Sequence, residues 1–144
     1  MVVTPHTKDH HSAYLAGKSY CLFTAKPAMS WIIDSGATDH ITPHLHLFQS
    51  FIPVSRPCFI TLPNGKNVQV QNIGTVALNT NIMLQDVLHV PKFHFNLLSA
   101  SKLAKHLSSN VVFTPTCCSL QDHLRNNQLV LGNETAGMYL VDVA

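Results

Sequence analysis

The sequence is poor in charged residues. Only 11% of its 144 residues are Asp, Glu, Lys or Arg, whereas 46% are hydrophobic, and this composition argues against a disordered chain. Nine basic and seven acidic residues leave a formal net charge of +2, which is too small to favour binding to nucleic acid or to an anionic membrane surface. We expect one compact domain whose surface is unusually apolar or is covered by a partner.

Long apolar runs and a disulfide framework are also missing. No run approaches the roughly 20 residues of a membrane-spanning helix, and His and Lys precede any apolar stretch at the N-terminus, unlike in a signal peptide. The four cysteines include the adjacent pair Cys117 and Cys118, so we expect reduced thiols rather than disulfides. These absences predict a cytoplasmic protein that does not bind a membrane.

Short segments of strand-forming residues follow one another along the sequence. Residues 31–33 are an apolar run that ends at an Asp-Ser-Gly turn, and residues 58–62 and 68–71 flank an Asn-Gly pair that is typical of a type I′ hairpin. Further strand patterns fall at 75–79, 82–90, 111–113, 117–121, 128–131 and 138–143. The pattern predicts an all-β fold, most simply a small closed barrel.

Two features interrupt the strand pattern. Gly74 is expected to separate the hairpin from the next strand. One short helix is predicted at about 99–107, because Ser99 is a good N-cap and apolar residues follow it at helical spacing.

The chain is expected to divide into three parts. Residues 1–29 are polar and irregular, which is typical of a partly flexible leader, with 20–24 as the candidate for a strand. Residues 30–116 form the ordered domain. Residues 117–144 add strands that we expect to pack on the same domain.

Asp34 directly follows the apolar run and precedes Ser-Gly. It is either a turn residue at the end of a buried strand, which is the commoner role of these residue types, or a carboxylate that the strand presents for chemistry. Two carboxylates about 3 Å apart share one proton, so that one activates water as a base while the other protonates a carbonyl oxygen. Asp-Ser-Gly occurs once in the sequence, so this chemistry requires a second copy of the chain across a two-fold axis.

Residues 31–40, WIIDSGATDH, resemble the protease signature of copia-type LTR retrotransposon polyproteins, W-[IL]-[ILV]-D-S-G-A-[ST]-x-H. Three later stretches fit the same family in the same order: LPNG at 62–65, DVLHVP at 86–91 and NLLS at 96–99. The tail, with GMYL at 137–140, is similar to the start of the pre-integrase region that follows the protease there. The resemblance covers roughly residues 20–144.

The resemblance implies a retropepsin-like aspartic protease that is active as a homodimer. Each subunit of that family supplies one catalytic carboxylate, here Asp34. The resemblance further assigns support of the active-site loop to Ser35, Gly36 and Ala37, and substrate binding to Gly36, Thr38 and Asp39.

Two further segments take their expected roles from the same resemblance. The hairpin tip corresponds to the flap that closes over a substrate, and it consists of Leu62, Pro63, Asn64, Gly65 and Lys66. The segment before the helix packs beneath the active-site loop, and it consists of Asn96, Leu97, Leu98 and Ser99. Ser99 stands where retropepsins have glycine, which leaves the packing beneath the loop open.

Ten histidines raise the alternative of a metal site. The obvious clusters are the pair at 10–11 and the series at 40, 44 and 46. Neither has the paired ligand spacing of a zinc site, so no metal and no other cofactor is expected. Lys102, Lys105 and His106 at the end of the predicted helix are expected to form a solvated face that suits the helix dipole.

The sequence thus predicts an aspartic endopeptidase that processes its own Gag-Pol polyprotein within cytoplasmic virus-like particles. Its expected partners are a second copy of the chain and a polypeptide substrate. Two alternatives remain open: a catalytically inactive or domesticated module with the same barrel, and a zinc-dependent pre-integrase fragment.

Overall fold

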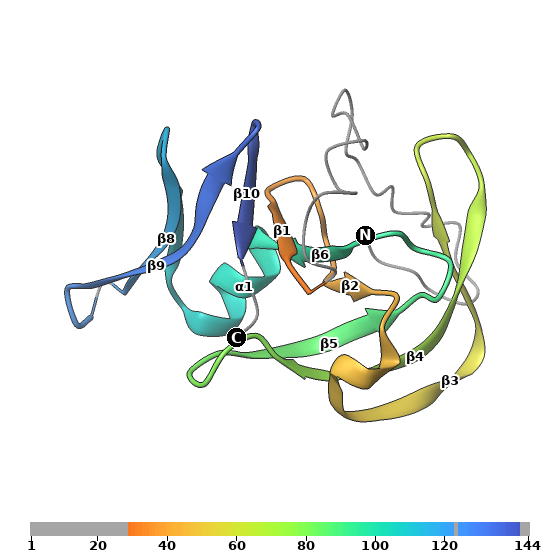
Figure 1. The fold of residues 1–144 in the computed structure, drawn as a ribbon. Helices are drawn as coiled ribbons and strands as arrows, with labels where there is room; N and C mark the ends of the chain where they lie inside the picture. The colour runs from red at the N-terminus through yellow and green to blue at the C-terminus, as the bar shows by residue number, and fades with distance from the viewer. Residues whose placement is uncertain (1–28, 123, 142–144) are drawn as a thin grey trace.

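The computed structural model describes residues 29–122 and 124–141, which form ten strands, one α-helix and one 3₁₀-helix (Figure 1). The strands are β1 (Trp31–Asp34), β2 (Ile41–Thr42), β3 (Phe48–Thr61), β4 (Asn67–Ala77), β5 (Met83–His89), β6 (Asn96–Ser99), β7 (Asn110–Phe113), β8 (Cys117–Asp122), β9 (Asn127–Thr135) and β10 (Met138–Val141). The helices are η2 (Leu45–Leu47) and α1 (Ala100–Leu107). The predicted all-β class with one short helix is confirmed. The strand expected near residues 20–24 lies outside the described residues.

The ten strands hydrogen-bond in the order β3-β4-β5-β2-β6-β1-β10-β9-β8-β7. Among the described strands, the end members β3 and β7 do not pair with each other, so the sheet is open and the predicted closed barrel is not observed. The reason lies at β1, which pairs in parallel with β6 on one side and antiparallel with β10 on the other. Both edges of β1 are therefore used, and the sheet continues into the wing of β7 to β10 instead of closing on β3 (Figure 1).

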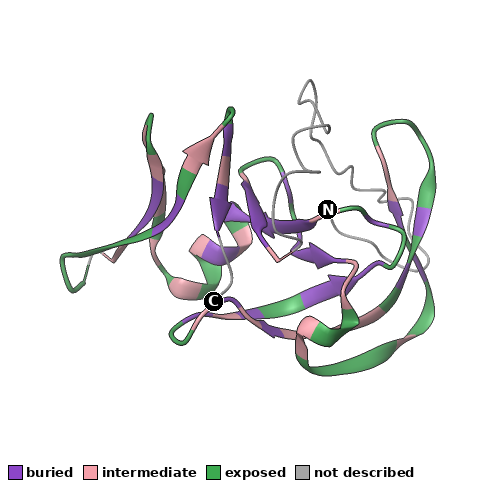
Figure 2. Cartoon of the chain, in the orientation of Figure 1, coloured by how far each residue is buried: buried purple, intermediate pink, exposed green. Residues whose placement is uncertain are grey.

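Alternate residues of the central strands face two different hydrophobic clusters, as the two-residue period of a β-strand requires. Ile32 and Leu97 lie in a first cluster with residues of β2, β3, β4 and β5, while Trp31, Ile33 and Leu98 lie in a second with residues of β5, α1, β8 and β9. Figure 2 shows the buried residues concentrated on β1, β6 and β10, whereas most of the β3–β4 hairpin is exposed. The strand that ends at Asp34 is thus buried on both faces.

The β3–β4 hairpin is longer than the sequence predicts. β3 begins at Phe48 rather than near residue 58, and β4 runs through Gly74 without a break. A Cβ atom at Gly74 would lie 2.0 Å from the backbone oxygen of Ser50. Glycine is therefore needed there because the two strands approach closely, and its predicted role as a separator between strands is wrong.

The turn of this hairpin also differs from the predicted type I′ turn. The Gly65 N–H donates to the Leu62 carbonyl at 2.9 Å, and the Leu62 N–H donates to the Lys66 carbonyl at 2.8 Å. Gly65 has a φ of 83°, but Asn64 is not among the residues with positive φ. The tip is therefore a four-residue turn from Leu62 to Gly65 whose last residue is the left-handed glycine, and Pro63 supplies the φ that the second position requires.

Helix α1 begins and ends as its sequence suggests. The Ser99 hydroxyl accepts a hydrogen bond from the Lys102 N–H, which is the predicted N-cap. At the other end Ser108 has a left-handed φ of 47°, and the Ser109 N–H donates to the Ala104 carbonyl. The helix predicted at about 99–107 is confirmed. In the part of the chain that the structure describes, no helix has the length and apolar character to cross a membrane.

Candidate functional site

Asp34 is the last residue of β1 and is half-buried. Its Oδ1 atom accepts a hydrogen bond from the Gly36 N–H at 2.7 Å, which folds the Ser35-Gly36 turn around the carboxylate. A Cβ atom on Gly36 would lie 3.3 Å from Oδ1, so glycine gives the turn its room. The Asp34 Oδ2 atom is buried and has no hydrogen-bond partner among the described residues. One half of the carboxylate is therefore satisfied and the other half is not.

The residues after Asp34 include both exposed and buried positions. Ser35, Gly36 and Thr38 are exposed, while Ala37 is buried in the first hydrophobic cluster, to which the hairpin strands also contribute. The structure thus leaves three of the predicted loop and substrate residues open to solvent and uses Ala37 as the anchor between them.

The predicted packing segment lies beside β1 in register, with Leu97 opposite Ile32 and Leu98 opposite Ile33. Its last residue, Ser99, lies opposite Asp34 and is buried, and its hydroxyl donates to the Ala37 carbonyl at 2.7 Å. Ser99 stands where the resemblance to retropepsins predicts a glycine, and its hydroxyl thus adds a hydrogen bond to the Asp34 loop.

The first residue of the same segment holds the beginning of β1. The Asn96 side chain accepts a hydrogen bond from the Thr42 hydroxyl at 2.6 Å and donates to the Ser30 carbonyl at 3.2 Å. Asn96 and Ser99 therefore fix the two ends of β1 by different side-chain bonds.

His40, the last residue of the loop, is buried beneath it and bonded to Ser99. It is 2% exposed, and its Nδ1 atom accepts a hydrogen bond from the Ser99 N–H at 3.0 Å. Burial, and to a lesser degree the nearby Lys102 and His106, lower the His40 pKa to about 3. The ring is therefore neutral at physiological pH, and because Nδ1 is an acceptor the proton lies on Nε2.

Asp39, which the sequence assigns to substrate binding, is buried and forms an ion pair with Lys102, whose Nζ lies 3.2 Å from Oδ1. The same Nζ donates to the Asp86 carbonyl at 2.9 Å. Asp86 has a left-handed φ of 50° and lies at a bulge of β5, where the register with β4 shifts. Lys102 thus ties helix α1 to both the Asp34 loop and β5.

Sequence reasoning missed the role of Lys102, for which it predicts a solvated face. The side chain of Lys102 is only 23% exposed, and that of Asp39 only 12%. The two residues are 63 positions apart in the sequence, and they meet because β1 and β6 pair in parallel. The usable signal is local: Lys102 lies three residues after the N-cap of the helix, on the turn that faces the loop.

The predicted flap residues lie at the tip of the β3–β4 hairpin. Leu62 is half-buried, and Pro63, Asn64, Gly65 and Lys66 are exposed. Among residues 29–122 and 124–141 the hydrogen bonds of the tip are internal to it, including one from the Lys66 N–H to Asn64 Oδ1 at 2.9 Å. Figure 1 shows the tip and the loop after β1 on the same side of the molecule.

No metal site is evident in residues 29–122 and 124–141, since no three His, Cys, Asp or Glu side chains gather there as a metal ion would require. The rings of His44 and His46 lie 5.5 Å apart between centroids. The pair at 10–11 lies outside the described residues.

Comparisons with known proteins relate this site to polyproteins. Residues 31–107 match the family model described as "Pol polyprotein, beta-barrel domain". The chain is 28% identical over 115 residues, 78% of its length, to the "Retrovirus-related Pol polyprotein from transposon RE2" of Arabidopsis thaliana. It is 26% identical over 113 residues, 76% of its length, to the corresponding polyprotein from transposon RE1 of the same plant. It is 26% identical over 99 residues, 66% of its length, to that from transposon TNT 1-94 of Nicotiana tabacum.

These relatives are much longer than the chain, which spans 8% of the RE1 and RE2 polyproteins and 7% of the TNT 1-94 polyprotein. No solved structure matches the chain. The family match begins at the first residue of β1 and ends at the last residue of α1, so it includes Asp34, the hairpin and Ser99. Because that segment is more than half of the sequence, the chain belongs to the family of Pol polyprotein β-barrel domains.

Proposed function

We propose that this domain is an aspartic endopeptidase of a copia-type retrotransposon, that it acts as a homodimer, and that it cleaves its own Gag-Pol polyprotein within virus-like particles. The observation that carries the proposal is the Asp34 carboxylate, which ends a strand whose first three residues are buried. Its Oδ1 atom is hydrogen-bonded, and its buried Oδ2 atom has no partner among the residues that the structure describes. An unpaired buried carboxylate oxygen is costly unless a further group completes the site.

The proposed mechanism needs Asp34 from two subunits. Two carboxylates at hydrogen-bonding distance share one proton. The ionised Asp34 takes a proton from water, which attacks the peptide carbonyl, while the protonated Asp34 of the other subunit donates its proton to the carbonyl oxygen. In the second step the Asp34 that gained a proton gives it to the leaving nitrogen as the C–N bond breaks, and the other Asp34 takes a proton back from a hydroxyl of the intermediate. The Gly36 N–H bond to Oδ1 keeps each carboxylate oriented through both steps.

The surrounding residues take roles that follow from their exposure. Ser35, Gly36 and Thr38 are exposed beside Asp34 and are available to a substrate backbone. The hairpin tip at 62–66 serves as the flap over a peptide bound as an extended strand. Asp39 is paired with Lys102. In this proposal the ion pair holds the conformation of the Asp34 loop, in addition to any contact that Asp39 makes with the substrate.

The test is cleavage of the chain's own flanking polyprotein, followed by mass spectrometry of the products. Asp34→Asn removes the charge and the shared proton, so we expect cleavage to fall by at least about 1,000-fold while the unfolding temperature and the dimer are retained. Asp122→Asn is the matched control, because Asp122 lies in β8, away from the loop, and should leave cleavage unchanged. Equal cleavage by wild type and Asp34→Asn would refute the proposal.

A second candidate function is a non-catalytic binding or structural module with the same fold. It is favoured by one observation, that a single chain provides one Asp34 half-site. A dimer too weak to form would leave the fold intact without activity. Sedimentation across a concentration series separates the two, because the protease requires a dimer at the concentrations at which the polyprotein is cut.

A further inference from the structure

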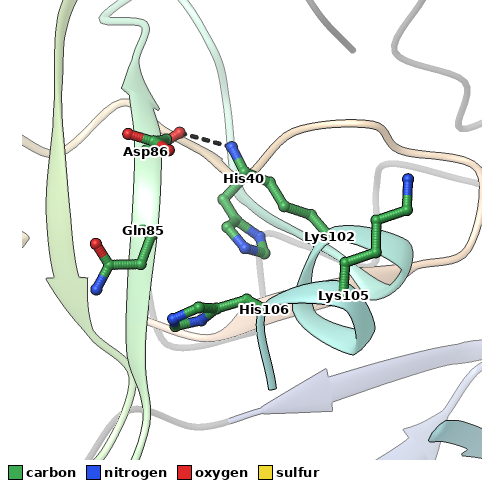
Figure 3. A pocket seen from close by; sticks show the side chains of 6 residues that line it. All are labelled: His40, Gln85, Asp86, Lys102, Lys105 and His106. Carbon is green, nitrogen blue, oxygen red and sulfur yellow. Dashed lines mark hydrogen bonds between the residues drawn. The ribbon is translucent and has the colours of Figure 1, made fainter. Parts of the chain in front are cut away.

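A second polar site lies behind the Asp34 loop. It is a cavity of about 310 Å³ between β5 and helix α1. We call it the His40 pocket, and it is lined by His40, Gln85, Asp86, Lys102, Lys105 and His106 (Figure 3). The loop supplies His40, β5 supplies two residues and α1 supplies three, so three separate elements converge on one space.

His40 presents a buried donor to this pocket. Its Nδ1 atom is used by the Ser99 N–H, so the neutral ring carries its proton on Nε2. The side chain is 2% exposed, and the structure gives the Nε2–H no acceptor among the described residues. Figure 3 shows the ring between the strand that carries Gln85 and helix α1. Nε2 is not among the fully buried side-chain atoms that lack a partner, so this N–H reaches the pocket and can donate to a ligand there.

The rest of the lining is also rich in donors. Lys105 and His106 are exposed at the rim, and the Gln85 amide offers two further N–H groups. The charge of Lys102 is balanced by Asp39, and Asp86 is the one acidic residue of the lining. Five of the six lining residues can therefore donate a hydrogen bond, so donors outnumber acceptors, which include the Asp86 carboxylate and the Gln85 side-chain oxygen.

We propose that the His40 pocket binds an oxyanion, either a carboxylate or a phosphate group. The bound oxygen atoms accept from His40 Nε2 at the base and from Lys105 and His106 at the rim. Because His40 belongs to the Asp34 loop and Lys102 is bonded to Asp39 of that loop, the ligand lies directly behind the loop. Binding at this pocket does not depend on proteolysis.

The experiment titrates the full chain with sodium phosphate and, separately, with sodium acetate. Sodium chloride holds the ionic strength constant, and the imidazole ¹⁵N signals of His40 and His106 are followed by NMR. We expect saturable shifts of both rings. Tighter binding of phosphate than of acetate identifies a phosphate group as the ligand, and the reverse identifies a carboxylate.

Two double variants make the result specific to the pocket. Lys105→Gln with His106→Gln removes the ammonium and the imidazole at the rim, and affinity read from the His40 signal should fall about tenfold. Lys92→Gln with His94→Gln removes the same residue types from exposed positions outside the pocket, and should leave the affinity unchanged. Shifts that do not saturate with either anion, or equal affinities of the two double variants, would overturn the proposal.

Discussion

The two segments proposed to meet a substrate are built in opposite ways. The loop from Asp34 to His40 is held from behind by Ser99, and its buried Asp39 is paired with Lys102. The hairpin tip at 62–66 is mostly exposed, and within the described part of the chain its hydrogen bonds join residues of the tip to each other. One half of the proposed site is therefore fixed to the core, and the other half is free to respond to what binds.

This difference matches the demands of the proposed chemistry. A carboxylate must be held within a fraction of an ångström of its working position, and supporting hydrogen bonds provide that precision. A cover over a substrate must open, and segments that open are those with few buried contacts. Changes to the braced loop should therefore alter global stability, whereas changes to the tip should act locally.

Acidification should cause the largest loss in the free energy of unfolding, through the buried His40 of the Asp34 loop. The folded pKa of His40, about 3, lies below its unfolded value of 6.5, so the unfolded chain binds a proton first as the pH falls. The stabilisation is complete above about pH 6.5 and is lost between pH 6.5 and about pH 3, amounting to about 3 kcal/mol between pH 7 and pH 4. Urea denaturation at the two pH values measures it.

His89, whose pKa is also lowered by burial, contributes to the same loss, so a variant is needed to assign it. His40→Asn keeps an acceptor for the Ser99 N–H but has no titrating ring, and it should lose less stability than wild type on acidification. An identical loss in both proteins would show that His40 does not carry the effect.

Ser99→Ala should be the next largest change. It removes the N-cap of α1 and leaves the Ala37 carbonyl without its 2.7 Å donor, at a combined cost of about 2–3 kcal/mol in the free energy of unfolding. Ser101→Ala is the control, because its hydroxyl is 3.5 Å from the same carbonyl and the residue is exposed. Equal destabilisation by the two variants would show that the Ser99 hydroxyl does not stabilise the loop and the helix as described.

Lys102→Met should destabilise by about 1–2 kcal/mol, because Asp39 is left as a largely buried carboxylate without its cation. Lys105→Met removes an exposed cation from the same helix and should cost less than about 0.5 kcal/mol. Thermal unfolding of the three proteins side by side is sufficient. If both variants unfold like wild type, the ion pair does not hold the loop.

Gly65→Ala should have the smallest effect on the whole molecule. The left-handed φ of 83° disfavours a side chain, although a Cβ there meets no atom within 4 Å, so about 1 kcal/mol is lost within the hairpin. Amide hydrogen exchange should accelerate at the tip and remain unchanged in β1. Gly65→Asn tolerates this φ better and should exchange more slowly than Gly65→Ala. Faster exchange in β1 would contradict the view that changes at the hairpin tip act only locally.

Local chemistry made part of this arrangement predictable. The apolar run before Asp34, the hairpin tip and the Ser99 cap each depend on neighbours within a few residues, and the structure has a strand, a turn and a helix start at those places. The resemblance also pointed to the segment at 96–99, which pairs with β1 in the structure.

The rest depended on strand neighbours that a sequence does not reveal. Proline cannot donate to a strand ladder, yet Pro53 and Pro57 both lie in β3. Among the described strands β3 pairs on one side only, and its register shifts between residues 53 and 58. Gly74 is predicted to be a boundary between strands because the sequence does not show its close contact with Ser50, which lies on the neighbouring strand. The open sheet follows from the pairing of β1 with β10, for which no local signal exists.

That pairing also has a consequence for how the molecule is made. β1 is the first described strand to leave the ribosome, but β10, which covers one of its edges, is the last. During synthesis the strand that carries Asp34 therefore waits with one edge uncovered until nearly all of the described chain has emerged. Pairings between such distant segments form slowly, so the Asp34 site should be completed late, after the hairpin has already folded.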